Sequence, residues 1–151
     1  MLRHTVATLA YRGAKSMRGA PAHFTEFQAP EKARTPGQLL AHIGDLLDWA
    51  LAMAQGKPAW RDSPALGWDA GVERFHKALE AFDAYLDSDQ PLHVPAEKLF
   101  QGPIADALTH VGQMLLLRRL AGAPVRGENY FKADIASGRV GVAQKAAVLE
   151  F

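Results

Sequence analysis

The 151-residue chain contains no cysteine, and this absence excludes several kinds of structure and chemistry. A disulfide framework, a thiolate zinc site and a cysteine nucleophile are all ruled out. Any metal ion must therefore bind to nitrogen and oxygen ligands. The lack of cysteine fits a reducing compartment, and no long apolar signal core follows Met1, so we expect a cytoplasmic protein.

Long apolar runs, strand-like alternation and an excess of one charge are also missing. No run approaches the roughly 18 apolar residues that a membrane span needs, so we expect no membrane association. The 17 basic and 16 acidic residues nearly balance, and the basic residues near the start are too sparse to indicate nucleic-acid binding. The remaining composition, 48% hydrophobic and 22% charged, is typical of a soluble globular domain.

Helix end signals and apolar spacing predict an all-α fold with four long helices. The first is expected over residues 2–17. The second has the clearest start, because Thr35 is a good N-cap, Pro36 suits a first helical turn and Gln38 completes a capping box. Apolar residues then recur at helical spacing until Gly56, which we expect to end the helix.

The third and fourth helices are predicted from similar signals. The third should begin after the capping residue and proline at 62–64 and carry an apolar seam with spacings of four and three residues. The fourth should run over 102–121 and close at Gly122. The seam consists of Trp68, Val72, Phe75, Leu79, Phe82 and Leu86, and the fourth helix should bury Ile104, Leu108, Val111, Leu115 and Leu116.

These elements predict an antiparallel four-helix bundle over residues 1–122, with one long crossover-like connection. Residues 123–151 lack a long periodic pattern, but apolar and aromatic anchors recur between glycines. We therefore expect an irregular C-terminal wrap packed on the bundle, with a short helix around 129–136 and a single domain overall. The anchors are Val125, Tyr130, Phe131, Ile135, Val140 and Val142.

Three polar residues could meet inside this bundle and carry chemistry. Asp106 and His110 are four residues apart on the fourth helix, so their side chains stack on one face. His42 lies within the apolar stripe of the second helix. Two imidazoles and a carboxylate suit a divalent transition metal such as Zn²⁺, Ni²⁺, Fe²⁺ or Mn²⁺, with positions left for water or substrate. The alternative is a buried ion pair, since Asp106 would hold a neighbouring histidine charged.

Four other side chains are candidates for a supporting role. Gln113 could donate to a metal ligand from the same helix face, or bond to another helix. Asp45 follows His42 by three residues and could be a ligand or an orienting partner; otherwise it is a solvated or salt-bridging acid. In the tail, Glu128 and Tyr130 could form a lid with acid–base groups, and the alternative is a packed wrap.

Two segments of the chain resemble the DinB/YfiT group of metalloenzymes. They are LLAHI, which contains His42, and THVGQMLLLRRLAG, which contains His110. The resemblance covers residues 1–122 and implies a four-helix bundle, commonly dimeric. It also implies a divalent metal held by three histidines, one from the second helix and two, four residues apart, from the fourth.

The motif on the fourth helix is matched in part. His42 and His110 stand at two of the histidine positions, and the residues after His110 keep the Gly-Gln that ends the family motif. Asp106 replaces the third histidine, and Val111 stands where arginine is usual. A carboxylate can serve as a ligand there, because two nitrogens and one carboxylate also form a metal site.

The resemblance implies a metal-dependent enzyme that activates a small thiol or water for attack on a small electrophile. Its class would be transferase, hydrolase or isomerase, its substrate a small molecule, and its assembly a homodimer. The first rival is a non-catalytic DinB-like domain for dimerisation or binding, in which the trio is an ion-paired core element.

The second rival is a ferritin-like di-iron protein. Glu73 and His76 have the Glu-x-x-His spacing of such sites, but the second helix lacks the glutamate that they need. We expect both residues on a solvated flank of the third helix. The remaining histidines have no partner at ligand spacing and are expected at the surface: His4, His23 and His93.

Overall fold

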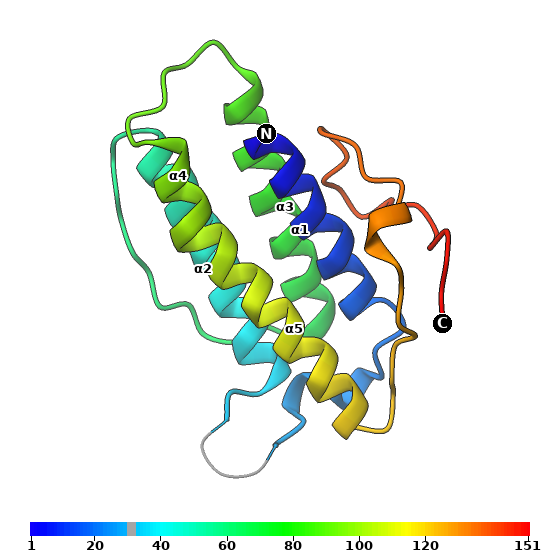
Figure 1. The fold of residues 1–151 in the computed structure, drawn as a ribbon. Coiled ribbons are helices and arrows are strands. Elements are labelled where there is room, and N and C mark those ends of the chain that lie inside the picture. The colour runs from blue at the N-terminus through cyan, green and yellow to red at the C-terminus, as the bar shows by residue number, and fades with distance from the viewer. Residues whose placement is uncertain (30–32) are drawn as a thin grey trace.

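The computed structural model describes residues 1–29 and 33–151, and its all-α class confirms the prediction (Figure 1). Within those ranges the only β-structure is an isolated bridge between Glu128 and Glu150. None of the described helices combines the length and the apolar character that crossing a bilayer requires. The long helices are α1 (Leu2–Met17), α2 (Pro36–Ala54), α3 (Trp68–Asp87) and α5 (Ala105–Leu120), with a short α4 (Ala96–Leu99).

Helix α1 occupies its predicted range, and α2 begins at the predicted capping box. The Thr35 hydroxyl oxygen accepts a hydrogen bond from the Gln38 N–H at 3.2 Å, and the Thr35 N–H donates to the Gln38 side-chain oxygen at 2.9 Å. These bonds satisfy donors that a helix start leaves unpaired. Gly56 has a φ of 73°, a left-handed conformation that suits glycine just beyond a helix end, and it follows α2 as predicted.

The predicted start of α3 is wrong. The helix begins at Trp68, after Gly67, and has no side-chain cap. The N–H and hydroxyl of Ser63 instead donate to the Asp45 carboxylate of α2, at 2.9 and 2.6 Å. A tertiary contact therefore engages Ser63, which lies between the predicted cap and the proline, and the helix begins four residues after Pro64.

The fourth long helix starts earlier than predicted, because α4 and a π-helical segment at Phe100–Ile104 lead directly into α5. Pro103 lies in this segment, whose wider turn accommodates a residue without an N–H. The predicted burial of Leu116 is wrong, since its side chain is exposed while Met114 and Leu117 are buried. Apolar residues surround much of this helix, so their spacing does not identify the inward face.

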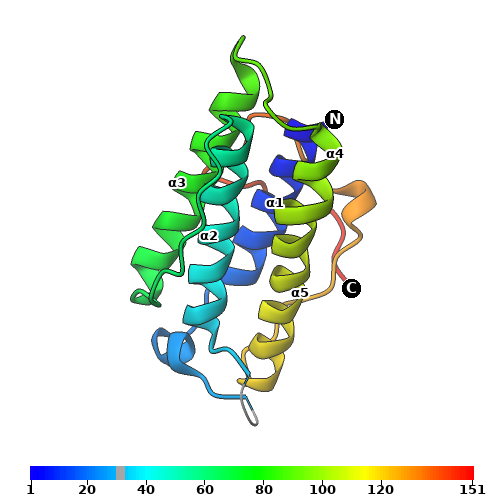
Figure 2. The same cartoon turned by 90° about the vertical axis from the view of Figure 1, so that its left-hand side faces the viewer.

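The long helices lie side by side around a shared core, and their directions are mixed (Figures 1 and 2). Helices α2 and α3 run the same way, since the Tyr85 hydroxyl donates to the Ala54 carbonyl near both their ends, at 3.2 Å. Helices α1 and α3 run in opposite directions, since Arg3 pairs with Asp83 at 2.8 Å. The predicted antiparallel arrangement needs correction for α2 and α3, because connection 55–67 runs back along α2 (Figure 2).

The core gathers around the predicted seam of α3. Phe75, Leu79 and Phe82 are fully buried, while Trp68 is only partly covered. Burying side chains of this size contributes roughly 1.5–3 kcal/mol each, so the seam holds α3 against its neighbours. An ideal Cβ on Gly13 of α1 would lie 2.4 Å from the Phe75 ring, so only glycine allows this close approach.

The C-terminal residues 123–151 fold back along α1 (Figure 1). The buried Glu128 carboxylate accepts hydrogen bonds from the Tyr11 hydroxyl at 2.6 Å and from the Lys15 ammonium at 2.7 Å. Burial, together with the nearby Glu128 charge, raises the pKa of Tyr11, so the phenol stays protonated and donates this bond. A charge-assisted cluster thus fastens the tail to the first helix.

The tail uses only some of its predicted anchors. Val140 is buried, but Phe131 and Val142 are exposed, so the prediction for these two is wrong. The predicted short helix is reduced to one 3₁₀ turn at Tyr130–Lys132. Polar contacts such as those of Glu128 replace the missing apolar ones.

Candidate metal centre

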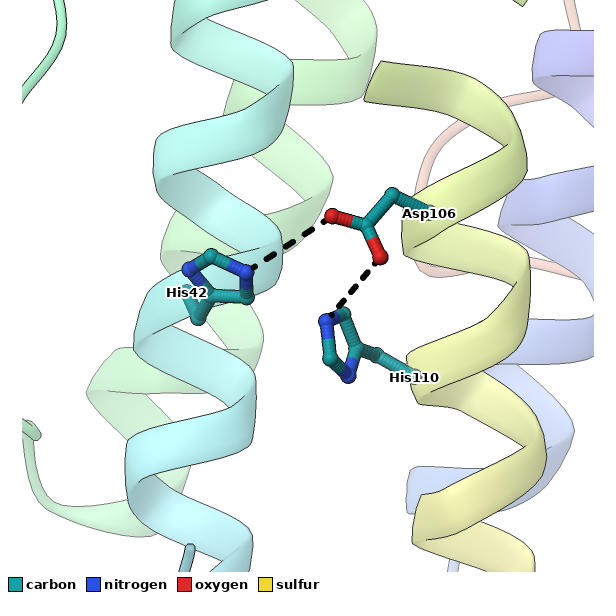
Figure 3. Close-up of side chains that lie close together, drawn as sticks. All are labelled: His42, Asp106 and His110. Carbon is teal, nitrogen blue, oxygen red and sulfur yellow. Dashed lines mark ion pairs between the residues drawn. The ribbon is translucent and has the colours of Figure 1, made fainter. Parts of the chain in front are cut away.

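The three predicted ligand residues come together between α2 and α5 (Figure 3). His42 projects from α2, while Asp106 and His110 project from α5. Their spacing of four residues lines Asp106 and His110 on one helix face, as the sequence predicted. The side-by-side packing of α2 and α5 then brings His42 to the same point.

The nitrogen and oxygen atoms of this trio lie close enough together for one ion. His110 Nε2 is 3.2 Å from Asp106 Oδ1, and His42 Nε2 is 3.9 Å from Asp106 Oδ2. One ligand atom from each residue lies within 4.8 Å of the others, and no other such group occurs in ranges 1–29 and 33–151. Ligands bonded at about 2.0–2.2 Å in a tetrahedral site lie roughly 3.3 Å apart, so small side-chain rotations would complete the geometry. The residues therefore fit a divalent ion.

The trio is covered on one side and open on the other. The His42 and His110 side chains are 17% and 12% exposed, whereas the Asp106 side chain is 48% exposed. The two imidazole rings meet edge to face, with centroids 4.8 Å apart. Solvent therefore reaches the trio at Asp106, while the two imidazoles are largely covered.

The surroundings of His42 favour its neutral form. Burial lowers the pKa of His42, and the charges of Arg34 and His110 lower it further. Asp106 and Asp45 act in the opposite direction without reversing the shift. A neutral imidazole offers a lone pair to a metal, and it is a weaker partner for a carboxylate than imidazolium is.

Gln113 contacts the ligand that the sequence indicated. Its side-chain oxygen lies 3.2 Å from His110 Nδ1. If Nδ1 carries the proton and donates to this oxygen, then Nε2, which faces Asp106, keeps its lone pair. In that tautomer the contact orients the His110 ring and leaves Nε2 free for a metal.

Asp45 has a different set of partners from those expected of a ligand. It is buried, and its carboxylate accepts hydrogen bonds from Ser63 and, at 2.6 Å, from Arg74 of α3. Burial opposes the charged form, but the hydrogen bonds from Ser63 and Arg74 outweigh it and lower the pKa of Asp45. Asp45 is thus a salt-bridging acid that fixes connection 55–67 and α3 to α2, rather than a partner of His42.

Trp60 borders the trio, and it was not identified from the sequence as a neighbour of His42. Its ring stands edge to face against His42, with centroids 5.7 Å apart, and against Trp49 at 5.8 Å. The indole N–H donates to Asp62 at 3.0 Å. Trp60 lies in an irregular connection 18 residues from His42, so no periodic pattern could have associated the two.

A polar pocket of about 440 Å³ also adjoins the trio and shares His42 with it. It lies between the start of α2 and residues 62–65 of the connection. The pocket was not predicted from the sequence, because residues 62–65 reach α2 only through the tertiary course of the connection.

The tail residues considered for a lid contact α1 instead of the trio. Glu128 is bound to Tyr11 and Lys15, and the Tyr130 ring packs on Tyr11 and Arg12. Helix α1 and the tail lie on the side of the molecule away from α2 (Figure 1). In this structure the two residues form a packed wrap and do not cover the candidate centre.

The Glu-x-x-His pair of α3 does not form a metal site. Glu73 is exposed and pairs with Lys77 at 2.6 Å. His76, predicted on a solvated flank, is buried instead, with Nδ1 3.2 Å from the Val140 carbonyl. The prediction failed because the tail covers this part of α3. The remaining histidines are exposed as expected, namely His4, His23 and His93.

The chain matches no family model, no curated protein and no solved structure.

Proposed function

We propose that this chain is a metal-dependent enzyme with a four-helix bundle of the DinB type, in which His42, Asp106 and His110 hold a divalent ion. The convergence of these three side chains from two separate helices, within 4.8 Å and open to solvent, is the observation that carries the proposal. The donor set of two nitrogens and one carboxylate accepts Zn²⁺, Ni²⁺, Fe²⁺ or Mn²⁺.

A bound ion would supply Lewis acidity, which lowers the pKa of a small thiol or of water. The chain itself supplies ligand preparation: His42 is held neutral by burial, and Gln113 orients the His110 ring. The Trp60 ring packs edge to face against the His42 imidazole. The proposed reaction is attack of a thiol or water on a small electrophile, and the proposed assembly is a homodimer.

The test is the metal content of protein purified without chelator and then exposed to each of the four ions. We expect one ion per chain, and His110→Ala should lose it while keeping its helicity. The substitution leaves a cavity at a largely buried imidazole, which should cost about 1–3 kcal/mol of stability, whereas water satisfies the half-exposed Asp106 carboxylate. His93→Ala is the matched control, because His93 is exposed and lies outside the trio.

A second candidate is a non-catalytic domain in which the same trio is an ion-paired element. The 3.2 Å ion pair between His110 Nε2 and Asp106 Oδ1 favours it. The metal measurement separates the two candidates. A chain that neither carries nor takes up any of the four ions would refute the enzyme and leave the binding domain.

A further inference from the structure

The pocket beside His42 has the composition of a ligand site. Its polar lining comes from two segments: the start of α2, with the residue just before its cap, and connection 55–67. The main polar residues are Arg34, Gln38, His42, Asp45, Asp62 and Ser63. Because His42 also belongs to the trio, a molecule in the pocket lies next to the proposed metal centre.

The charged side chains of this pocket differ in whether they already have a hydrogen-bond partner. The Asp45 carboxylate is bound by Ser63 and Arg74, which leaves it little capacity for a ligand. The Asp62 carboxylate accepts the Trp60 indole N–H. Arg34 is exposed, and within the described parts of the chain its guanidinium makes no hydrogen bond or ion pair with a carboxylate.

Arg34 and His42 line the same pocket, so the guanidinium shares this space with the His42 imidazole of the trio. Gln38 lines the same pocket, and its side-chain oxygen is already held by the Thr35 N–H. The amide NH₂ of Gln38 is therefore the group that remains to donate to a ligand.

We propose that this pocket binds the carboxylate of a small monoanionic substrate, with Arg34 as its ionic partner and Gln38 as a second donor. A guanidinium pairs with a carboxylate through two parallel hydrogen bonds. The Asp62 charge opposes any anion in the pocket, and it opposes a dianion such as phosphate about twice as strongly as a monocarboxylate. The inference rests on the proposed function in one respect: the reacting atom of the bound molecule would lie at the His42 end of the pocket.

Two probes of equal length test the proposal, 3-mercaptopropionate and its neutral analogue 3-mercapto-1-propanol. Each is titrated into metal-free protein while the backbone amide signals of Gln38, Ser63 and Ala65 are followed by NMR. We expect the acid to bind at least about tenfold more tightly than the alcohol, because only the acid pairs with Arg34. In Arg34→Gln this preference should disappear, whereas Arg119→Gln, which removes an exposed arginine outside the pocket, should retain it.

The same two probes are then titrated into Co²⁺-loaded protein, where thiolate binding to the metal is read from absorption. A preference for the acid in metal-free protein that takes up no Co²⁺ would support the pocket and refute the metal centre. Equal binding of acid and alcohol to the Co²⁺ form, with no preference in the metal-free form, would overturn the carboxylate pocket and leave the metal centre standing. A preference that survives in Arg34→Gln would also overturn it.

Discussion

Replacement of Gln113 by leucine probes whether the candidate centre is organised for a metal. Gln113 contacts His110 on the nitrogen opposite the one that faces Asp106, at 3.2 Å. Gln113→Leu removes the acceptor but keeps a side chain of similar size and helix propensity. The His110 ring is then free to rotate and to take the other tautomer, which puts the proton on Nε2.

The expected loss follows from the geometry of this contact. Removing an outer hydrogen bond from a ligating histidine typically lowers metal affinity about 10- to 100-fold. Gln113 is exposed and its contact is near the upper end of hydrogen-bond distances, so water competes for the same nitrogen. We therefore expect about a tenfold loss, which is about 1.4 kcal/mol.

The assay is Zn²⁺ competition against a chelator of known affinity, with thermal unfolding of the metal-free protein as a check on folding. Gln101→Leu is the matched control, because Gln101 is an exposed glutamine of the adjoining π-helical segment and lies outside the trio. An unchanged affinity in Gln113→Leu, or an equal loss in the control, would refute the idea that this contact prepares His110.

Two further outcomes follow from the structure. Asp106→His should raise the affinity for Zn²⁺ relative to Mn²⁺ by about tenfold, because imidazole suits zinc and carboxylate suits manganese. Competition titrations measure this ratio of affinities. An unchanged ratio would exclude residue 106 as a ligand. Burial lowers the pKa of His76 below its ordinary 6.5, although the Val140 carbonyl opposes this, so the unfolded state binds more protons below that pH. The free energy of unfolding should therefore be full above about pH 6.5 and fall by at most about 1.4 kcal/mol per pH unit below it. His76→Asn keeps a donor toward Val140 and should show a smaller fall when both proteins are unfolded in urea at several pH values. Identical pH profiles of the two proteins would contradict this.

Elements with strong local signals were predictable from the sequence. The capping box at Thr35 and Gln38 formed as expected, because its two hydrogen bonds join residues three apart and need no tertiary partner. The alignment of Asp106 and His110 was predictable for a similar reason, since helix geometry alone puts residues four apart on one face.

Contacts between distant segments were not predictable in this way. From the sequence, Asp45 could be a partner of His42, because it follows His42 by three residues. In the structure its carboxylate binds Ser63 and Arg74 instead, because α3 lies along α2. The same contact holds Ser63 outside α3, in the segment where the helix was predicted to start. Trp60 lies against His42 because a long irregular connection passes there, and such a connection has no period from which its course could be inferred.

Local sequence determined the helical class, most helix ends and the partners on a single helix face, because those depend on hydrogen bonds and spacings within a few residues. Tertiary packing alone decided that α2 and α3 run in the same direction and that His42 reaches Asp106 and His110 from another helix. It also decided which carboxylates are paired with a cation, as Asp45 is with Arg74, and where the pocket beside His42 lies. Those features depend on burial and on charges brought together by the whole chain, which no short stretch of sequence contains.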